Sequence, residues 1–235
     1  MNFNFDKAVV FDWGELYYIK LENEIGIEAF KLLNSNQENA LLSIKDKFRA
    51  NLKNDEAFSS LEESEKGNYY SQMYEIEELA IKELQRQQRY SICLSIFSFF
   101  EGRLKAVCNK IERNFNFKIK IEDLNGNDDL LRYWNYLEKV FEMEMDSLMP
   151  NFTPIKQNKN IRNIIAHHEG YANVRQKQKM EMSNGLSLKE TGDLFRIQID
   201  KSEYINYLLV KMEGFFEKML SSIDKRYSEK VFREK

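Results

Sequence analysis

The scarcity of turn-forming residues is the feature that most constrains the fold of this chain. Only 9 glycines and 2 prolines occur among 235 residues. A strand-rich fold of this length needs many turns, and turns depend on these two residue types. Apolar residues also recur at steps of three and four along much of the chain, which is the period of an amphipathic helix. The sequence therefore predicts a mainly α-helical protein.

The first half of the chain is predicted to form long helices. Their expected ranges are 12–33, 37–52, 56–63 and 69–115, with a break at Lys66-Gly67-Asn68. Within the longest of them, one face carries a closely spaced apolar stripe of Cys93, Phe97, Phe100, Leu104, Val107, Ile111 and Phe115. The segment Gln85 to Arg89 is polar on every side, so it is either a solvated bridge or a place where the helix bends.

The second half is predicted to contain shorter elements. Asp128 or Asp129 is expected to cap a helix over 130–145, Pro150 and Pro154 to bracket a loop, and further helices to cover 155–171 and 202–226. Leu186 to Leu188 and Leu194 to Ile199 alternate in the strand period on either side of a turn-like sequence. The expected fold is thus a helical bundle with a long central helix and a small β-hairpin before the C-terminal helix.

Composition narrows the cellular setting. Charged residues make up 31% of the chain, and the longest apolar run, Ser91 to Phe100, is too short for a membrane span. The N-terminal residues lack a secretory signal pattern. Cys93 and Cys108 would lie about 22 Å apart on one helix, too far for a disulfide. These features predict a cytoplasmic protein with reduced thiols, and neither a metal-ligand cluster nor a cofactor motif occurs.

The segment from Ile161 to Gly170 is the most informative part of the sequence. On a helix, Ile164, Ile165 and His168 fall within about 60° of Ile161, which makes one buried stripe. Asn163 and His167 are four residues apart and share a neighbouring polar face. His168 is therefore expected to be partly buried, whereas His167 is expected to meet solvent or a substrate.

Charge around this segment differs from that of the whole chain. The net charge is −3, which argues against broad electrostatic wrapping of nucleic acid. Between residues 156 and 179, however, the chain has six basic residues and a single acid, Glu169. The basic residues are Lys156, Lys159, Arg162, Arg175, Lys177 and Lys179. This excess suits a local phosphate contact, and an ordinary solvated face accounts for it equally well.

Arg162, the polar residue Asn163 and His167 after four intervening residues resemble the RNA-cleaving signature of the HEPN superfamily. The stretch from Ser95 to Leu104 resembles the long helix against which that family packs its motif helix. The resemblance covers roughly residues 69–226. It suggests a division into an N-terminal helical region of unknown function, 1–66, and a HEPN-like helical domain, 67–235.

The resemblance implies a metal-independent endoribonuclease that uses no cofactor. In such an enzyme the RNA 2′-hydroxyl is the nucleophile, and the products are a 2′,3′-cyclic phosphate and a 5′-hydroxyl. His167 would transfer protons near neutral pH, Arg162 would stabilise charge on the phosphate oxygens, and Asn163 would position the histidine or the phosphate. Lys159, His168 and Glu101 are further candidates for substrate contacts.

The family also implies partners. One copy of the motif makes an incomplete site, so a homodimer with a composite active site is expected. Family members act as toxins or antiviral-defence effectors, which implies an antitoxin or activating partner protein. Some carry a tyrosine two residues after the motif histidine for modification by a partner, but that position is Glu169 here. The alternative function is a non-catalytic subunit of a defence system that binds RNA, a nucleotide or a partner protein.

Overall fold

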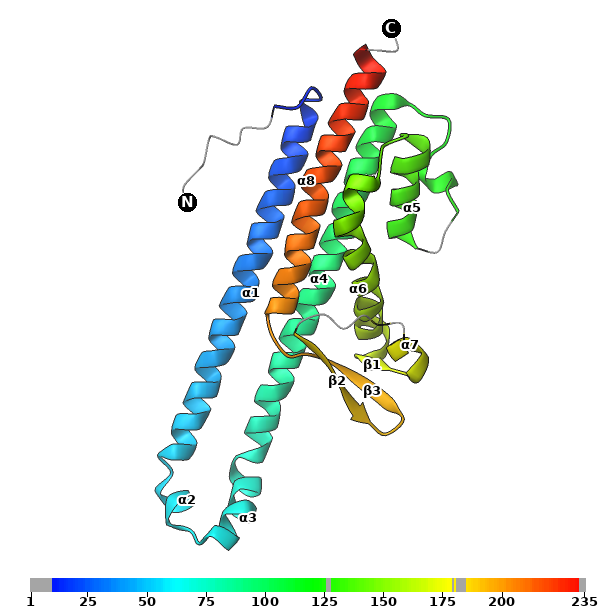
Figure 1. The fold of residues 1–235 in the computed structure, drawn as a ribbon. Coiled ribbons are helices and arrows are strands. Elements are labelled where there is room, and N and C mark those ends of the chain that lie inside the picture. The colour runs from blue at the N-terminus through cyan, green and yellow to red at the C-terminus, as the bar shows by residue number, and fades with distance from the viewer. Residues whose placement is uncertain (1–9, 126–127, 179, 181–184, 233–235) are drawn as a thin grey trace.

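The computed structural model describes residues 10–125, 128–178, 180 and 185–232, and it is mainly helical (Figure 1). Residues 1–9, on which the prediction about a secretory signal rests, lie outside the described part. So does Lys179, which belongs to the predicted basic excess. In chain order the elements are α1 (Glu15–Lys53), α2 (Glu56–Ser60), α3 (Glu63–Met73), α4 (Glu75–Phe115), α5 (Asp129–Asn135), α6 (Met149–His168), β1 (Tyr171–Ala172), α7 (Val174–Gln178), β2 (Leu186–Thr191), β3 (Leu194–Ile199) and α8 (Glu203–Phe232).

Three long helices form the body of the molecule. α1 runs in the opposite direction to α4 and α8, while α5 and α6 cover the other side of α4 (Figure 1). The predicted stripe on α4 is confirmed, because its members from Cys93 to Ile111 are buried and Phe115 is partly buried. Leu16, Ile19 and Ile27 of α1 belong to the same core. The predicted long central helix is thus the element around which the others pack.

The first two predicted helices are one helix. α1 continues for 39 residues through Asn34-Ser35-Asn36, where a break was expected. Asn34 is only 2% exposed, and its Nδ2 donates to Asn206 Oδ1 of α8 at 3.0 Å. A polar residue with a partner in the neighbouring helix does not interrupt the helix that carries it.

The expected break at residues 66–68 is also wrong, since it lies inside α3. The chain is instead interrupted at Tyr74, which has φ −124° between α3 and α4. The hydroxyls of Tyr69 and Tyr74 both donate to the carboxylate of Asp55, the residue that caps α2. These bonds close the tip of the hairpin made by α1 and α4. The suggested division between residues 66 and 67 therefore falls within a helix.

The polar segment Gln85 to Arg89 is neither a bend nor a solvated bridge. α4 is continuous there, and Arg89 is 5% exposed. Its guanidinium pairs with both oxygens of Glu38 at 2.7 Å and donates to the Ile199 carbonyl at 2.7 Å. Burial of this charge is compensated by α1 on one side and by the hairpin on the other.

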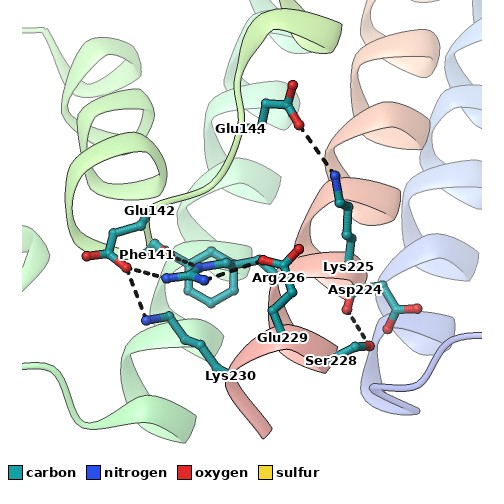
Figure 2. Close-up of polar contacts among 9 residues, drawn as sticks. All are labelled: Phe141, Glu142, Glu144, Asp224, Lys225, Arg226, Ser228, Glu229 and Lys230. Carbon is teal, nitrogen blue, oxygen red and sulfur yellow. Dashed lines mark hydrogen bonds and ion pairs between the residues drawn. The ribbon is translucent and has the colours of Figure 1, made fainter. Parts of the chain in front are cut away.

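The segment after α5 differs from the predicted single helix over 130–145. Asp128 caps α5 as expected, by accepting from Leu130 and Leu131. A π turn, Tyr136–Val140, then ends the helix, and Glu142 has a positive φ of 58°. Arg226 of α8 donates to the Phe141 carbonyl at 3.2 Å and pairs with Glu142, while Lys225 pairs with Glu144 (Figure 2). Contacts with α8 thus hold this segment outside a helix.

The predicted hairpin is confirmed. β2 and β3 pair antiparallel, with Lys189 opposite Arg196 and a two-residue turn at Gly192-Asp193. The short strand β1 adds to β3 on the other side, in a region expected to continue the preceding helix. Leu186, Leu188, Ile197 and Ile199 pack toward the core. The opposite face of the hairpin, with Lys189 and Arg196, remains free to line a cavity.

Candidate functional site

α6 carries Arg162, Asn163 and His167, and the packing of α6 fixes their positions. The helix begins at Met149, so Pro150 and Pro154 lie inside it rather than bracketing a loop. Pro150 is tolerated because amides in the first turn have no helical acceptor. Asn158 is buried and accepts from the hydroxyl of Tyr204 in α8 at 2.9 Å. The motif therefore stands on a helix anchored one turn earlier to α8.

The end of α6 determines the exposure of the histidines. Ile161, Ile164 and Ile165 are buried, as the sequence predicted, and His167 is exposed. His168 is exposed too, so its predicted burial is wrong. The reason is that α6 ends at His168, where Glu169 turns into the left-handed region at φ 51°. The apolar stripe thus stops one turn before the angular pattern suggests.

Gly170 makes that turn possible. It has φ 83°, and its amide donates to the Ile164 carbonyl at 3.1 Å, which gives a carbonyl of the last turn a partner. A Cβ at this position would lie 2.2 Å from the hydroxyl oxygen of Tyr90. Glycine is therefore required both by the backbone conformation and by the close approach of α4.

Arg162, the charged residue of the motif, has an unusual environment. Its side chain is half-buried, and Nη1 donates to Asn163 Oδ1 at 3.0 Å. Its Nε is buried without an acceptor, and among the described residues no carboxylate lies within 4.0 Å of the guanidinium. An N–H of an arginine that has neither water nor an acceptor carries a free-energy cost.

The positive charge of Arg162 also affects a buried residue of α4. Burial raises the pKa of the Cys93 thiol to about 12, and the positive charge of Arg162 acts against that rise. The bond from Arg162 Nη1 to Asn163 draws one end of the guanidinium toward the face that Asn163 shares with His167, because these two residues are four apart on the helix.

Lys159 and Glu101, predicted as substrate contacts, contact each other. Lys159 Nζ lies 2.8 Å from Glu101 Oε1 of α4 and 2.7 Å from Asp128 Oδ1. Burial lowers the pKa of Lys159, but the bonds that its ammonium donates to these two carboxylates outweigh that effect and raise the pKa. Asp128 is the partner that sequence reasoning missed, because nothing in the local pattern relates residues 31 positions apart.

The predicted basic excess is smaller in the folded protein. Lys159 is neutralised by its two acids, and Lys177 Nζ lies 3.8 Å from the centre of the Phe195 ring. Lys156 and Arg175 are exposed. The structure therefore brings Arg162, Asn163 and His167 to one stretch of α6, while Lys159 and Glu101 form a separate ion pair network beside it.

Within the described residues, neither a metal-binding cluster nor a membrane-spanning helix accompanies this site. In the part of the chain that the structure describes, no three histidines, cysteines or acidic residues are grouped so as to hold a metal ion. No helix in the described ranges is long and apolar enough to cross a membrane. Comparisons with protein-family models, with curated proteins and with solved structures each give no match.

Proposed function

We propose that the protein is a metal-independent endoribonuclease whose site is built on Arg162, Asn163 and His167. The observation that carries the proposal is the 3.0 Å bond from Arg162 to Asn163, which orients a cation without a carboxylate partner toward the face of the exposed His167. An arginine held in this way can take a phosphate oxygen as the partner that it lacks.

The chemistry follows from these residue types. The 2′-hydroxyl attacks the adjacent phosphorus, the bond from phosphorus to the 5′-oxygen breaks, and a 2′,3′-cyclic phosphate and a 5′-hydroxyl result. His167 takes the proton from the attacking hydroxyl or gives one to the leaving oxygen. Arg162 stabilises the charge that develops on the phosphate oxygens. Lys159 contributes only if it gives up one of its two acidic partners.

One histidine cannot serve as base and as acid in the same step. We therefore propose that two copies of the chain pair so that two motifs face one cleft. The roles of toxin or antiviral-defence effector, and an antitoxin or activating partner, belong to the same proposal and rest on the resemblance of the motif.

The test is incubation of the purified protein with a mixed pool of transfer and messenger RNA in excess EDTA, followed by mapping of new RNA ends. We expect cyclic-phosphate ends with the unchanged protein. His167→Ala is expected to reduce cutting by about 100-fold or more, the scale of one lost acid–base group. Lys218→Ala is the control, because it removes an exposed side chain from another helix, α8, and this variant should cut nearly normally.

Arg162→Ala and Arg162→Lys extend the test, with helicity and particle mass measured for each variant. Loss of cutting in both, with unchanged folding, supports a role for the arginine fork rather than for charge alone. Full activity of His167→Ala would contradict the proposal. RNA binding without cutting by the unchanged dimer would instead support the non-catalytic alternative.

A further inference from the structure

A second site candidate lies between α4 and the hairpin, away from the motif. A cavity of about 350 Å³ lies between the first half of α4 and the strands β2 and β3. Figure 1 shows the hairpin beside this part of α4. One wall is the face of α4 that carries Leu79, Lys82, Glu83 and Arg86, at helical steps of three and four. The other wall is the outer face of the hairpin, where Lys189 and Arg196 are cross-strand neighbours.

The lining of this cavity is cationic in an acidic protein. Four basic side chains line it, namely Lys82, Arg86, Lys189 and Arg196, against the two acids Glu83 and Asp200. Lys82 is also paired with Glu78 at 2.7 Å, just outside the lining, so a local excess of one positive charge remains, whereas the whole chain has a net charge of −3. A concave surface of this kind concentrates small anions.

The cations on the hairpin side are not fully satisfied. Arg196 Nη2 lies 3.7 Å from Glu83 Oε2, and its Nε is buried without an acceptor. Lys189 has neither an ion pair nor a side-chain hydrogen bond within the described ranges. Glu83 is shared, because Arg86 also pairs with it, and the Arg86 hydrogen bond lowers the pKa of Glu83 to about 2. One carboxylate thus serves two arginines.

The remaining lining combines apolar groups with a side-chain amide. Leu79 is 55% exposed, and it lies beside the cavity with Ile199. Gln198 adds a side-chain amide whose oxygen accepts from Ser187 at 3.5 Å, which leaves the NH₂ group to donate. Pockets for small molecules combine apolar walls with a few polar groups in this way, and their volumes begin near about 300 Å³.

We propose that this cavity binds a mononucleotide, with its phosphate on Lys189 and Arg196 and its base against Leu79 and Gln198. A free nucleotide is favoured over an RNA strand, because Glu83, Asp200 and the acidic chain as a whole repel a long polyanion while a small dianion meets the local excess. The site also touches the end of the motif helix: Arg86 lies 5.0 Å from the centre of the Tyr90 ring, which packs on Gly170.

The test is calorimetric titration of the full chain with AMP and with GMP, with inorganic phosphate and an oligouridylate as competing arms. We expect nucleotide binding that Arg196→Gln and Lys189→Gln weaken at least about 10-fold, the scale of one lost charge-assisted hydrogen bond. Lys218→Gln is the control, because it removes the same charge from an exposed position on α8. Glu83→Gln is expected to tighten binding, since it removes the carboxylate that competes for Arg196.

The outcomes separate the proposal from its rivals. Circular dichroism checks that each variant is folded. If Arg196→Gln unfolds, Lys189→Gln still tests the site, because Lys189 is exposed. Affinities unchanged by both hairpin variants, or an absence of nucleotide binding up to millimolar concentration, would overturn the site. Equal affinity for inorganic phosphate would overturn the nucleotide assignment, and tighter binding of the oligouridylate would replace it with an RNA strand. None of these results depends on RNA cleavage.

Discussion

At the scale of single residues, two glycines of the chain have opposite roles. Gly170 lies at φ 83° against Tyr90, whereas Gly102 lies within α4, where an added Cβ would meet no atom within 4 Å. The first glycine permits a turn that other residues resist, and the second only adds conformational freedom to the unfolded chain. The two positions therefore make a matched pair.

We expect Gly170→Ala to lower the free energy of unfolding by about 1–3 kcal/mol, because the new methyl group requires a strained backbone and displaces Tyr90. Gly102→Ala should raise it by up to about 1 kcal/mol. Urea unfolding of both variants measures the difference. Equal stabilities would mean that the end of α6 does not have the conformation described.

At the scale of elements, Lys159 joins three segments that are separate in the sequence. It pairs with Glu101 of α4 and with Asp128, the residue that caps α5. Burial tends to raise the pKa of Asp128, but the hydrogen bond from Lys159 outweighs it, and the pKa is lowered. The motif helix is therefore held to α4 and α5 by charge as well as by apolar packing.

This lowered pKa predicts a dependence on pH. The stabilisation is fully present above the ordinary aspartate pKa of about 3.9 and is lost as the pH falls through the lower folded value. Asp128→Asn keeps the cap but removes the charge, so it should cost about 0.5–1.5 kcal/mol at pH 6 and progressively less toward pH 3. Urea unfolding at both pH values tests this. A cost that did not shrink at pH 3 would exclude the ion pair as its cause, and Asp129→Asn, in an exposed pair, is the control.

A second prediction at this scale concerns the segment after the π turn. Arg226 bonds to the Phe141 carbonyl and to Glu142 (Figure 2), so Arg226→Met should cost about 1–2 kcal/mol and speed amide hydrogen exchange in residues 141–145. Lys225→Met is the control, because the Lys225 pair with Glu144 is exposed. If exchange in this segment stays unchanged, α8 does not hold it.

At the scale of the whole molecule, Arg89 connects α1, α4 and the hairpin. It pairs with Glu38 and donates to the carbonyls of Ile199 and Asp200. Removing one partner of such a buried network leaves the others unsatisfied. The three parts of the molecule are therefore expected to unfold together.

We expect Arg89→Leu to lower the free energy of unfolding by about 3–5 kcal/mol. Arg49→Leu, which removes an exposed arginine of α1 paired with Asp46, should change it by less than about 1 kcal/mol. Thermal unfolding followed by circular dichroism compares the two variants. Similar melting temperatures would show that Arg89 does not join the three parts.

Several elements could be predicted from the chain without its fold, because their signals are local. The periodic stripe from Cys93 to Ile111, the cap at Asp128 and the alternation around Gly192 each depend on neighbours within a few residues. The same local spacing placed Asn163 and His167 on one face of α6. The helix-rich class followed from the scarcity of glycine and proline.

The remaining features depend on partners distant in the chain, so they emerged only in the folded molecule. Asn34 continues α1 because its Nδ2 bonds to Asn206, and Arg89 is buried because Glu38 and the hairpin surround it. Lys159 has acidic partners because Asp128 lies beside it. The exposure of His168 depends on where α6 stops, which Gly170 and Tyr90 determine together. The sequence does not show whether water or a protein group will surround a polar side chain, because only the fold supplies that partner.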